Sequence, residues 1–388
     1  ELHREAWTIM QRMHSQGRMP DNVSLAEQLN TDDALQRIAS WYEHNPTRSA
    51  LPQYVDDIRK AAAARAAIDT CMECQRKLQG DWRNQRALVD TQLRLEALHS
   101  QCQPTPTADE AMEKCLHRIN NRIDRAQQYG LAGIPTGFAP LDRATNGMDE
   151  GLHFIGGWSS GGKSALLVSC LIGIARHGYR WRMYSLDMPM DNFVTRIYQH
   201  SHHVSIDRVL RNDFDEGDRK RIAQTGANIL AKGCAIDEEA RSIHSVCRDA
   251  WLYRDTYDVL IIDTLQSAHI DGKFPGLTEL TIVNVNALKA LKKRLGKPVL
   301  VTCQAKDPPD RRETDSGKLS PPTLNDLYGG RTITQEAATV TIVYRSNYGK
   351  EDPADLHVPA TIKSAKNQNG IPVTITCQWN AKVGRFEA

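Results

Sequence analysis

A glycine-rich octapeptide of pattern G-x-x-x-x-G-K-S, residues 157–164, constrains this chain more than any other feature. It follows the largely apolar run 152–155 and precedes the apolar run 165–168, so it lies where a strand turns into a helix. In such a turn the glycines let backbone N–H groups converge on an anion, and the helix N-terminus adds partial positive charge. The sequence therefore predicts a loop that binds the phosphates of a nucleoside triphosphate.

The residues of this loop have distinct expected roles. Lys163 is expected to reach the β- and γ-phosphates, and the Ser164 hydroxyl is expected to ligate Mg²⁺. The other candidates for binding the nucleotide are Gly157, Ser159, Ser160, Gly161, Gly162 and Ala165. The competing interpretation is a glycine-rich turn with an accidental Lys-Ser pair, and it leaves the flanking strand and helix unexplained.

Three further apolar runs each end in a polar side chain that suits nucleotide chemistry. Asp263 is expected to hold the Mg²⁺ water shell, and the alternative role for it is a helix cap. Asp187 is expected to orient the attacking water, from the tip of the strand beside the phosphate-loop strand. Gln304 is expected to sense the γ-phosphate and to pass its state to the loop beyond, unless it is only a polar loop residue.

From residue 133 onward the chain predicts an α/β domain. Continuous apolar runs separated by segments of helical length indicate a mostly parallel sheet that is covered on both faces. The expected strands lie at 154–155, 181–186, 259–262, 298–302 and 339–344. Two later runs, 359–362 and 373–379, flank the pair Asn369-Gly370 and predict an antiparallel hairpin with an Asn-Gly turn.

The first part of the chain shows helical spacing and no strand-like alternation, which predicts an all-α domain. A polar, proline-rich stretch at 101–107 indicates a linker, and an amphipathic helix follows over 108–127. An apolar stripe isolated between linkers favours a docking surface over a core of its own. The predicted divisions are an N-terminal helical domain, a linker with its docking helix, and an α/β domain, at 1–100, 101–132 and 133–388. Because the chain begins with Glu1 and not Met, we expect residues to be missing before it.

Composition places few further limits on function. A net charge of +2, from 49 basic and 47 acidic residues, means that any binding to a polyanion depends on local basic loops. Nine scattered cysteines indicate reduced thiols and a cytoplasmic location. The single C-x-x-C pair, Cys71 and Cys74, lies in a helical stretch and favours helix packing over a zinc or redox site. No apolar run approaches 18 residues, so no membrane span is expected.

Two loops carry the cations that could meet a nucleic-acid backbone. The segment after Gln304 is rich in proline and glycine, and another cation lies in the loop after Asp263. The DNA-binding candidates are Lys273, Lys306, Arg311, Arg312 and Lys318. Contact with phosphates and an idle solvated loop explain these cations equally well. Aromatic residues are sparse in both loops, so base stacking is not indicated.

Several stretches, in order along the chain, resemble the DnaB-like replicative helicases. Those that carry the resemblance best are IPTGF (134–138), the phosphate loop, SLDMP (185–189), IDTLQ (262–266), KNQNG (366–370) and RF (385–386). The N-terminal runs VSLAEQL (23–29) and YVDDI (54–58) are also similar to that family's helical domain.

The resemblance implies a RecA-like ATPase domain joined by a linker helix to a helical N-terminal domain. It further implies ring hexamers that encircle single-stranded DNA at the replication fork, translocate 5′ to 3′ with ATP and Mg²⁺, and meet a primase and a helicase loader. The linker helix would dock on the adjacent subunit. ATP would lie between subunits, with Lys163, Ser164, Asp187, Asp263 and Gln304 on one side and Lys366 reaching in from the neighbour.

Two positions depart from the family pattern. Asp187 stands where the family has Glu, and Gln368 stands where the family has the arginine finger that neutralises transition-state charge. Because such a finger contributes about 10³–10⁵ in rate, either hydrolysis here is slow or another cation, Lys366 or Lys363, takes the role. The divergence indicates a phage or mobile-element member of the family.

Two rival functions follow from the same residues. A RecA-like ATPase of the recombination or clock type shares the phosphate loop and Asp263, but it would not explain the helical N-terminal domain. A catalytically weakened scaffold or loader would bind ATP and partners without unwinding DNA. The shorter carboxylate of Asp187 and the neutral side chain of Gln368 fit this second function.

Overall fold

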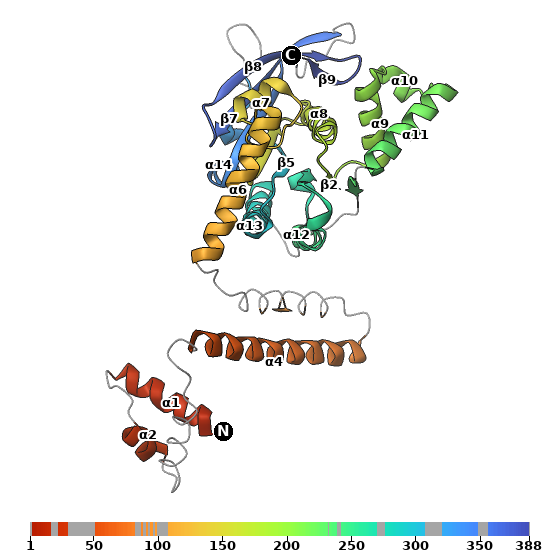
Figure 1. Cartoon of the computed structure of the whole chain (residues 1–388). Helices are drawn as coiled ribbons and strands as arrows, with labels where there is room; N and C mark the ends of the chain where they lie inside the picture. The colour runs from red at the N-terminus through yellow and green to blue at the C-terminus, as the bar shows by residue number, and fades with distance from the viewer. Residues whose placement is uncertain are drawn as a thin grey trace. The chain divides into compact units, whose positions relative to one another are not determined.

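The chain forms two compact units, residues 1–113 and 114–388 (Figure 1). The computed structural model describes residues 2–16, 22–29, 51–81, 87, 91, 94–95, 98, 108–231, 233–238, 242–269, 276–306, 320–347 and 356–387. The boundary between the units falls inside helix α6 (Ala108–Tyr129), so most of that helix belongs to the second unit. The three-part division of the chain stays a prediction.

Apart from Gln16 and Asp81, the described residues of the first unit are helical. They form α1 (Leu2–Ser15), α2 (Asn22–Leu29) and the 30-residue α4 (Leu51–Gly80). Helices α1 and α2 share a small apolar cluster that includes Ile9, Met13 and Leu25. In α4, Cys74 is buried and its thiol donates to the carbonyl of Ala87, so this cysteine packs between helical segments.

The second unit is built on a mixed sheet with the strand order β3-β2-β4-β5-β1-β6-β7-β8-β9 (Figure 1). Strands β1 to β6 run parallel, and β7, β8 and β9 add in antiparallel order. The strand bounds are β1 Leu152–Gly157, β2 Trp181–Ser185, β3 Ala235–Asp237, β4 Val259–Asp263, β5 Val299–Gln304, β6 Ala337–Arg345, β7 His357–Asn367, β8 Val373–Asn380 and β9 Arg385–Glu387. The predicted mostly parallel sheet is confirmed.

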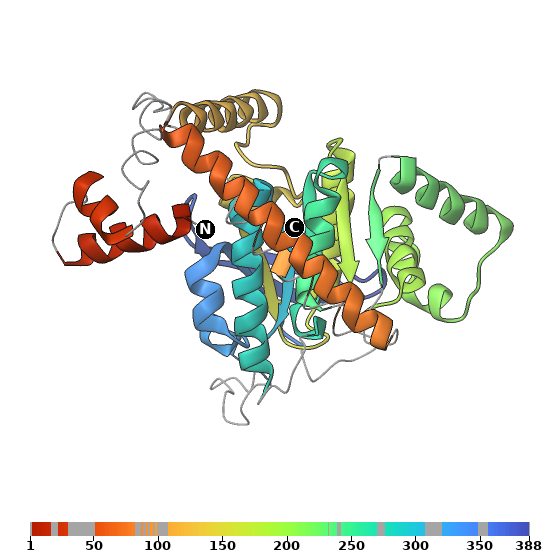
Figure 2. The ribbon, with the colours of Figure 1, turned by 90° about the horizontal axis from the view of Figure 1, so that it is seen from below.

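Helices cover both faces of this sheet because successive strand residues point to opposite sides. In β1, Ile155 joins an apolar cluster with α8 and α9, whereas its neighbour Phe154 joins a cluster with α12, α13 and α14. Helices α13 and α14 lie side by side on the second face (Figure 2). The helices of this unit beyond α6 are α7 Ala139–Thr145, α8 Lys163–Arg176, α9 Met190–His202, α10 Ile206–Leu210, α11 Glu216–Ala231, α12 Ile243–Leu252, α13 Leu277–Leu295 and α14 Gly330–Glu336. Short 3₁₀ turns lie at Arg254–Thr256, Leu265–Ser267 and Leu324–Asp326.

The strand that ends near Asp187 is not beside the phosphate-loop strand, so that part of the sequence prediction is wrong. In the sheet, β4 and β5 lie between β2 and β1. Local apolar patterning defines a strand, but it does not encode the sheet order, which depends on where each crossover helix returns the chain. Asp187 is nevertheless at the same edge as the phosphate loop, because the carboxyl ends of parallel strands meet there.

The C-terminal hairpin is confirmed as antiparallel, and it is longer than predicted. Strand β7 continues to Asn367, five residues beyond the predicted end, and Ser364 pairs with Val373. Neither Asn369 nor Gly370 has a positive φ, so the connection is not a two-residue turn of the type that an Asn-Gly pair favours. Side-chain bonds from the loop determine its path instead. Asn367 Nδ2 donates to the carbonyl of Ala144 at 2.7 Å, and Asn369 Nδ2 donates to Asp149 Oδ2 at 2.9 Å.

Candidate nucleotide-binding site

The phosphate loop has the geometry of an anion cradle. It begins where β1 ends at Gly157, and α8 begins at Lys163. Ser160 and Gly162 have φ values of 55° and 102°, which turn successive N–H groups toward one side. A Cβ at position 162 would lie 2.6 Å from Cζ of Phe386, so the close contact with this ring requires glycine. The strand-loop-helix context predicted from sequence is confirmed.

Lys163 is enclosed by the loop and is only 8% exposed. Its ammonium donates to the carbonyl of Trp158 at 2.7 Å. Burial lowers the pKa of Lys163, and the negative charges of Asp263 and Asp187 oppose that shift. Lys163 is therefore close enough to interact electrostatically with Asp263 and Asp187, the two carboxylates that were predicted from the sequence to serve this site.

Asp263 ends β4 and is 4% exposed. Burial raises the pKa of its carboxyl, while the Thr302 hydroxyl donates to Oδ1 and opposes the shift. Its backbone carbonyl accepts from the Leu186 N–H at 2.6 Å, and this bond holds the segment that carries Asp187 against β4. Thr302 was not selected from the sequence, because an interior threonine of an apolar strand gives no functional signal.

Gln304 lies directly beside the phosphate loop. It is the register partner of Gly157, and the N–H of the next residue, Ala305, donates to the Gly157 carbonyl at 2.9 Å. The Gln304 N–H itself donates to Oε1 of Gln266 at 3.1 Å, and Gln266 Nε2 donates to Thr281 on α13. Gln266 thus connects the end of β5 to a helix on the far face, a role that the sequence reasoning missed.

Asp187 lies two residues beyond β2 and is exposed. One cation near this edge was not predicted: Arg196 on α9 lies within electrostatic reach of Asp263. Desolvation lowers the pKa of Arg196, and the negative charge of Asp263 opposes that shift. An arginine at helical spacing in an amphipathic segment has no sequence signal that separates it from a solvated side chain.

Lys366 and Gln368 lie at the other edge of the sheet from the phosphate loop. Gln368 follows the end of β7, and its N–H donates at 3.0 Å to the carbonyl of Ala338 near the start of β6. Since β6 runs parallel to β1, this edge holds the amino end of β1, whereas the phosphate loop follows its carboxyl end. The six residues of β1 span about 20 Å.

The hairpin side chains differ in whether they are bonded within their own protomer or exposed to solvent. The Lys366 ammonium donates to the carbonyls of Thr334 and Ala337, at 2.5 Å each, so it holds the C-terminal end of α14. Lys363 and Gln368 are exposed. A single protomer therefore brings Lys163, Asp187, Asp263 and Gln304 to one edge, and it does not bring Lys366 or Gln368 to them.

The predicted DNA-contacting loops are only partly described. Lys306 is exposed just after β5, with its N–H bonded to the Asp326 carbonyl at 2.7 Å. The other four candidates, Lys273, Arg311, Arg312 and Lys318, lie outside the described residues.

The cradle and the donor set fit a nucleotide with a divalent cation. Within the described ranges, no group of three or more His, Cys, Asp or Glu side chains forms a metal cage of its own. Ser164 and Asp263 instead offer the few oxygen ligands that Mg²⁺ takes when phosphates supply the rest. Among the described helices, none is long and apolar enough to cross a membrane.

The sheet and its phosphate loop define a P-loop ATPase domain of the RecA-like class. The profile of the DnaB-like helicase C-terminal domain matches residues 133–388. The chain therefore belongs to the DnaB-like helicase family.

Similar proteins agree with this membership. The replicative DNA helicase DnaB of Leifsonia xyli subsp. xyli is 28% identical over 271 residues, which cover 66% of this chain and 56% of that protein. The DnaB of Pasteurella multocida is 22% identical over 99% of this chain and 85% of its own length. The chain thus spans only about half the length of several curated relatives that it matches.

Two solved structures share the fold. One, described as a DnaB-like replicative helicase and its interactions with primase, has a TM-score of 0.71 at 18% identity and covers 97% of this chain and 90% of its own. The other, described as an ATPase domain, has a TM-score of 0.59 at 20% identity, over 73% of this chain and 99% of its own.

Proposed function

We propose that this chain is an ATP-dependent DNA helicase of replication that works as a ring hexamer and moves 5′ to 3′ on single-stranded DNA. The observation that carries the proposal is the separation of the two halves of the site. The phosphate loop lies at one edge of the sheet, and the candidate finger residues, Lys366 and Gln368, lie at the other. Copies arranged head to tail would bring one protomer's hairpin to the next protomer's loop, and such heterologous contacts form a ring when the rotation between neighbours closes.

Within one site, each residue has a role that its position supports. Lys163 and the loop N–H groups hold the phosphates, and Ser164 and Asp263 hold Mg²⁺. Asp187 orients the attacking water and takes its proton, since its exposed carboxylate lies at the same edge. Gln304 senses the γ-phosphate. Because Lys306 follows it by only two residues, a shift of Gln304 is passed to the loop that comes after Lys306. Bound ATP supplies the reactive phosphoryl group.

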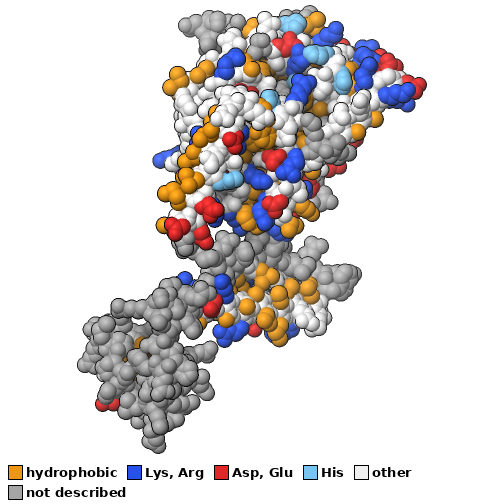
Figure 3. Space-filling view, viewed as in Figure 1, with side chains coloured by type: hydrophobic (Ala, Val, Ile, Leu, Met, Phe, Trp, Pro, Cys, Tyr) orange, Lys and Arg blue, Asp and Glu red, His pale blue; other side chains and the backbone are white. Residues whose placement is uncertain are grey.

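Helix α6 supplies the second contact between subunits in this proposal. Its side chains Met112, Leu116, Ile119 and Ile123 are 46–60% exposed, and no residue of the helix is buried in the single chain. These four residues, called the α6 apolar face below, recur every three or four positions and form one continuous stripe (Figure 3). Burial of this stripe on the adjacent protomer would stabilise the ring.

DNA and protein partners complete the proposal. The loop cations Lys273, Lys306, Arg311, Arg312 and Lys318 would contact the phosphate backbone in the centre of the ring. A primase and a helicase loader are the proposed protein partners. The related structure described with primase supports the first of them.

A catalytically weakened scaffold is the second candidate function. It is favoured by Gln368, which is exposed and neutral at the finger position, and by the shorter carboxylate Asp187. Such a protein would bind ATP and assemble without unwinding DNA.

Strand displacement on forked duplexes separates the two functions. With ATP and Mg²⁺, the helicase should unwind a fork that has a 5′ single-stranded tail and leave a fork that has only a 3′ tail intact. Lys163→Ala should abolish unwinding, because it removes the phosphate-binding ammonium. ATP binding and assembly without displacement on either fork would favour the scaffold, and displacement from the 3′ tail would contradict the proposed polarity.

A further inference from the structure

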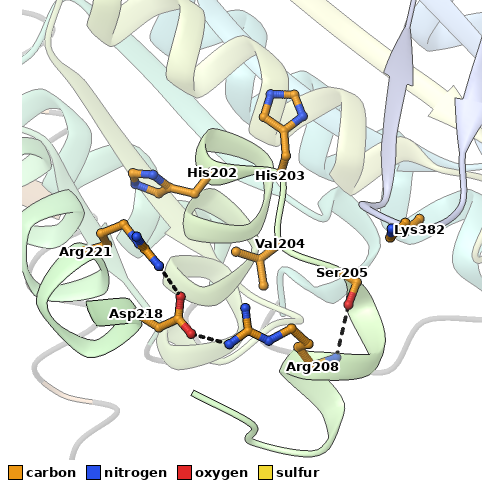
Figure 4. Close-up of a pocket in the computed structure, with 8 residues that line it drawn as sticks. All are labelled: His202, His203, Val204, Ser205, Arg208, Asp218, Arg221 and Lys382. Atoms are coloured by element: carbon orange, nitrogen blue, oxygen red, sulfur yellow. Dashed lines mark hydrogen bonds and ion pairs between the residues drawn. The ribbon is translucent and has the colours of Figure 1, made fainter. Parts of the chain in front are cut away.

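A cavity of about 410 Å³ lies between the helices α9 to α11 and the turn that joins β8 to β9 (Figure 4). Its walls include His202 and His203 at the end of α9, Arg208 on α10, Arg221 on α11, and Lys382 in the turn. These side chains converge on one space from three consecutive helices and from a turn much later in the chain. None of them belongs to the nucleotide site described above.

Asp218 is the single carboxylate among the lining residues, and it is already satisfied. Its side chain is 1% exposed and accepts from Tyr198 at 2.8 Å, from Arg221 at 2.7 Å and from Arg208. One buried negative charge therefore faces two guanidinium groups whose side chains are still 38% and 50% exposed. Arg208 also pairs with the exposed carboxylate of Asp213, Nε to Oδ2 at 3.8 Å, so two aspartates balance the two arginines and the net positive charge of the cavity comes from Lys382.

Lys382 adds its charge from the opposite wall. Its backbone is fixed, because its carbonyl accepts from Ile206 at 2.8 Å and its N–H donates to Asn380 at 3.1 Å. The side chain is exposed, and in the part of the chain that the structure describes its ammonium has no carboxylate partner. Figure 4 shows this side chain facing the two arginines across the cavity.

The pKa values of two histidines near the cavity are lowered mainly by burial and further by neighbouring cations. Burial lowers the pKa of His202, and the charges of Arg221 and His203 lower it further. Nearby, burial lowers the pKa of His200 to about 4, helped by Arg385. In Figure 3, basic and histidine side chains gather over this part of the surface.

We propose that this cavity binds a small anion that carries two linked phosphoryl groups, of the pyrophosphate type. Guanidinium forks match phosphate oxygens in bidentate fashion, and Lys382 can meet a second phosphoryl group across the cavity. The volume lies within the range of small-molecule sites.

The position of the cavity connects it to the nucleotide site on both sides. Helix α9 begins at Met190, three residues after Asp187. On the other side, Phe386 of β9 contacts Gly162 of the phosphate loop. An anion here would hold these two segments against each other.

Calorimetric titration of pyrophosphate into the full chain tests the proposal. A saturating non-hydrolysable ATP analogue and Mg²⁺ occupy the phosphate loop first. Pyrophosphate itself binds Mg²⁺ with heat, so a blank titration into the same buffer without protein is subtracted, and only a second site then gives residual heat. We expect one pyrophosphate per chain and binding weakened about tenfold or more in Lys382→Gln, because a charge-assisted contact is lost. The matched control is Lys220→Gln, an exposed lysine on α11 outside the cavity, which should bind as the parent does.

Three outcomes would overturn the proposal. The first is no heat above the blank once the ATP analogue is bound, and the second is equal affinity for pyrophosphate in Lys382→Gln and the parent. The third is a single-stranded oligonucleotide that binds in a Lys382-dependent way while pyrophosphate does not bind. A parallel titration with inorganic phosphate should show weaker binding, since a single phosphoryl group cannot reach both walls.

Discussion

Gln368 is the residue whose chemistry departs most from what ATP hydrolysis needs. It is exposed at the end of β7, with its N–H fixed to the Ala338 carbonyl, so the backbone already positions a side chain for a neighbour. An amide cannot neutralise the charge that develops on the transferred phosphoryl group. The cations closest in sequence are Lys366, which is bonded to carbonyls of its own protomer, and Lys363, which is exposed.

Gln368→Arg should raise DNA-stimulated ATP turnover by at least tenfold, since a finger arginine contributes about 10³–10⁵ in related ATPases. Steady-state phosphate release with single-stranded DNA measures the effect. Gln368→Glu is the charge-reversed control and should lower turnover. An unchanged rate in the arginine variant would mean that Gln368 does not limit hydrolysis.

Asp149 is a residue whose ionisation should control acid stability. Burial opposes ionisation of its carboxyl, but the bonds from His153 and Asn369 outweigh burial and lower the pKa to about 2. A depressed pKa stabilises the folded state above the unfolded value of 3.8, and this stability is lost as the pH falls toward 2. The shift corresponds to roughly 2 kcal/mol.

Urea unfolding of the parent and Asp149→Asn, followed by tryptophan fluorescence between pH 6 and pH 2, checks this prediction. The free energy of unfolding should differ by roughly 2 kcal/mol near pH 6, and the difference should shrink below pH 4. A difference that stays constant over this range would show that the contact acts through packing and not through charge.

At the scale of elements, the sequence predicted the strands well and their arrangement less well. Strands β1, β2, β4, β5 and β6 appear where the apolar runs placed them, and helix α8 follows the phosphate loop as predicted. The position of β2 could not be predicted, since adjacency is set by crossovers and not by the strand's own residues. Similarly, Thr302 and Gln266 contribute through contacts with partners 38 residues away, which no local pattern contains.

Helix α6 carries the element-scale prediction about assembly. Leu116→Asp with Ile119→Asp places two charges on the α6 apolar face. Each change removes roughly 1.5–3 kcal/mol of apolar burial, so association should weaken more than about 100-fold. Light scattering during gel filtration with ATP analogue measures the loss of the ring. Gln128→Asp, on the polar side of α6, should leave assembly intact, and a double variant that still forms rings would exclude this face from the interface.

At the scale of the whole molecule, the antiparallel addition of β7 to a parallel sheet determines where the two halves of the site lie. Because β7 returns along β6, the hairpin reaches the amino edge of β1 while the phosphate loop leaves from its carboxyl edge. The pairing of Asn369 with Asp149 fixes that loop on its own protomer. No side-chain rotation bridges about 20 Å, so hydrolysis in the proposed ring mechanism requires a second copy.

Mixing two inactive variants tests this shared site directly. One protomer carries Lys163→Ala and keeps its hairpin; the other carries Lys363→Ala, Lys366→Ala and Gln368→Ala and keeps its phosphate loop. Each alone should show little DNA-stimulated turnover, but in mixed rings an intact loop meets an intact hairpin at about a quarter of the interfaces. Turnover measured against mixing ratio should peak at equal amounts. A flat profile at the level of the separate variants would place the whole site within one protomer and contradict the ring mechanism.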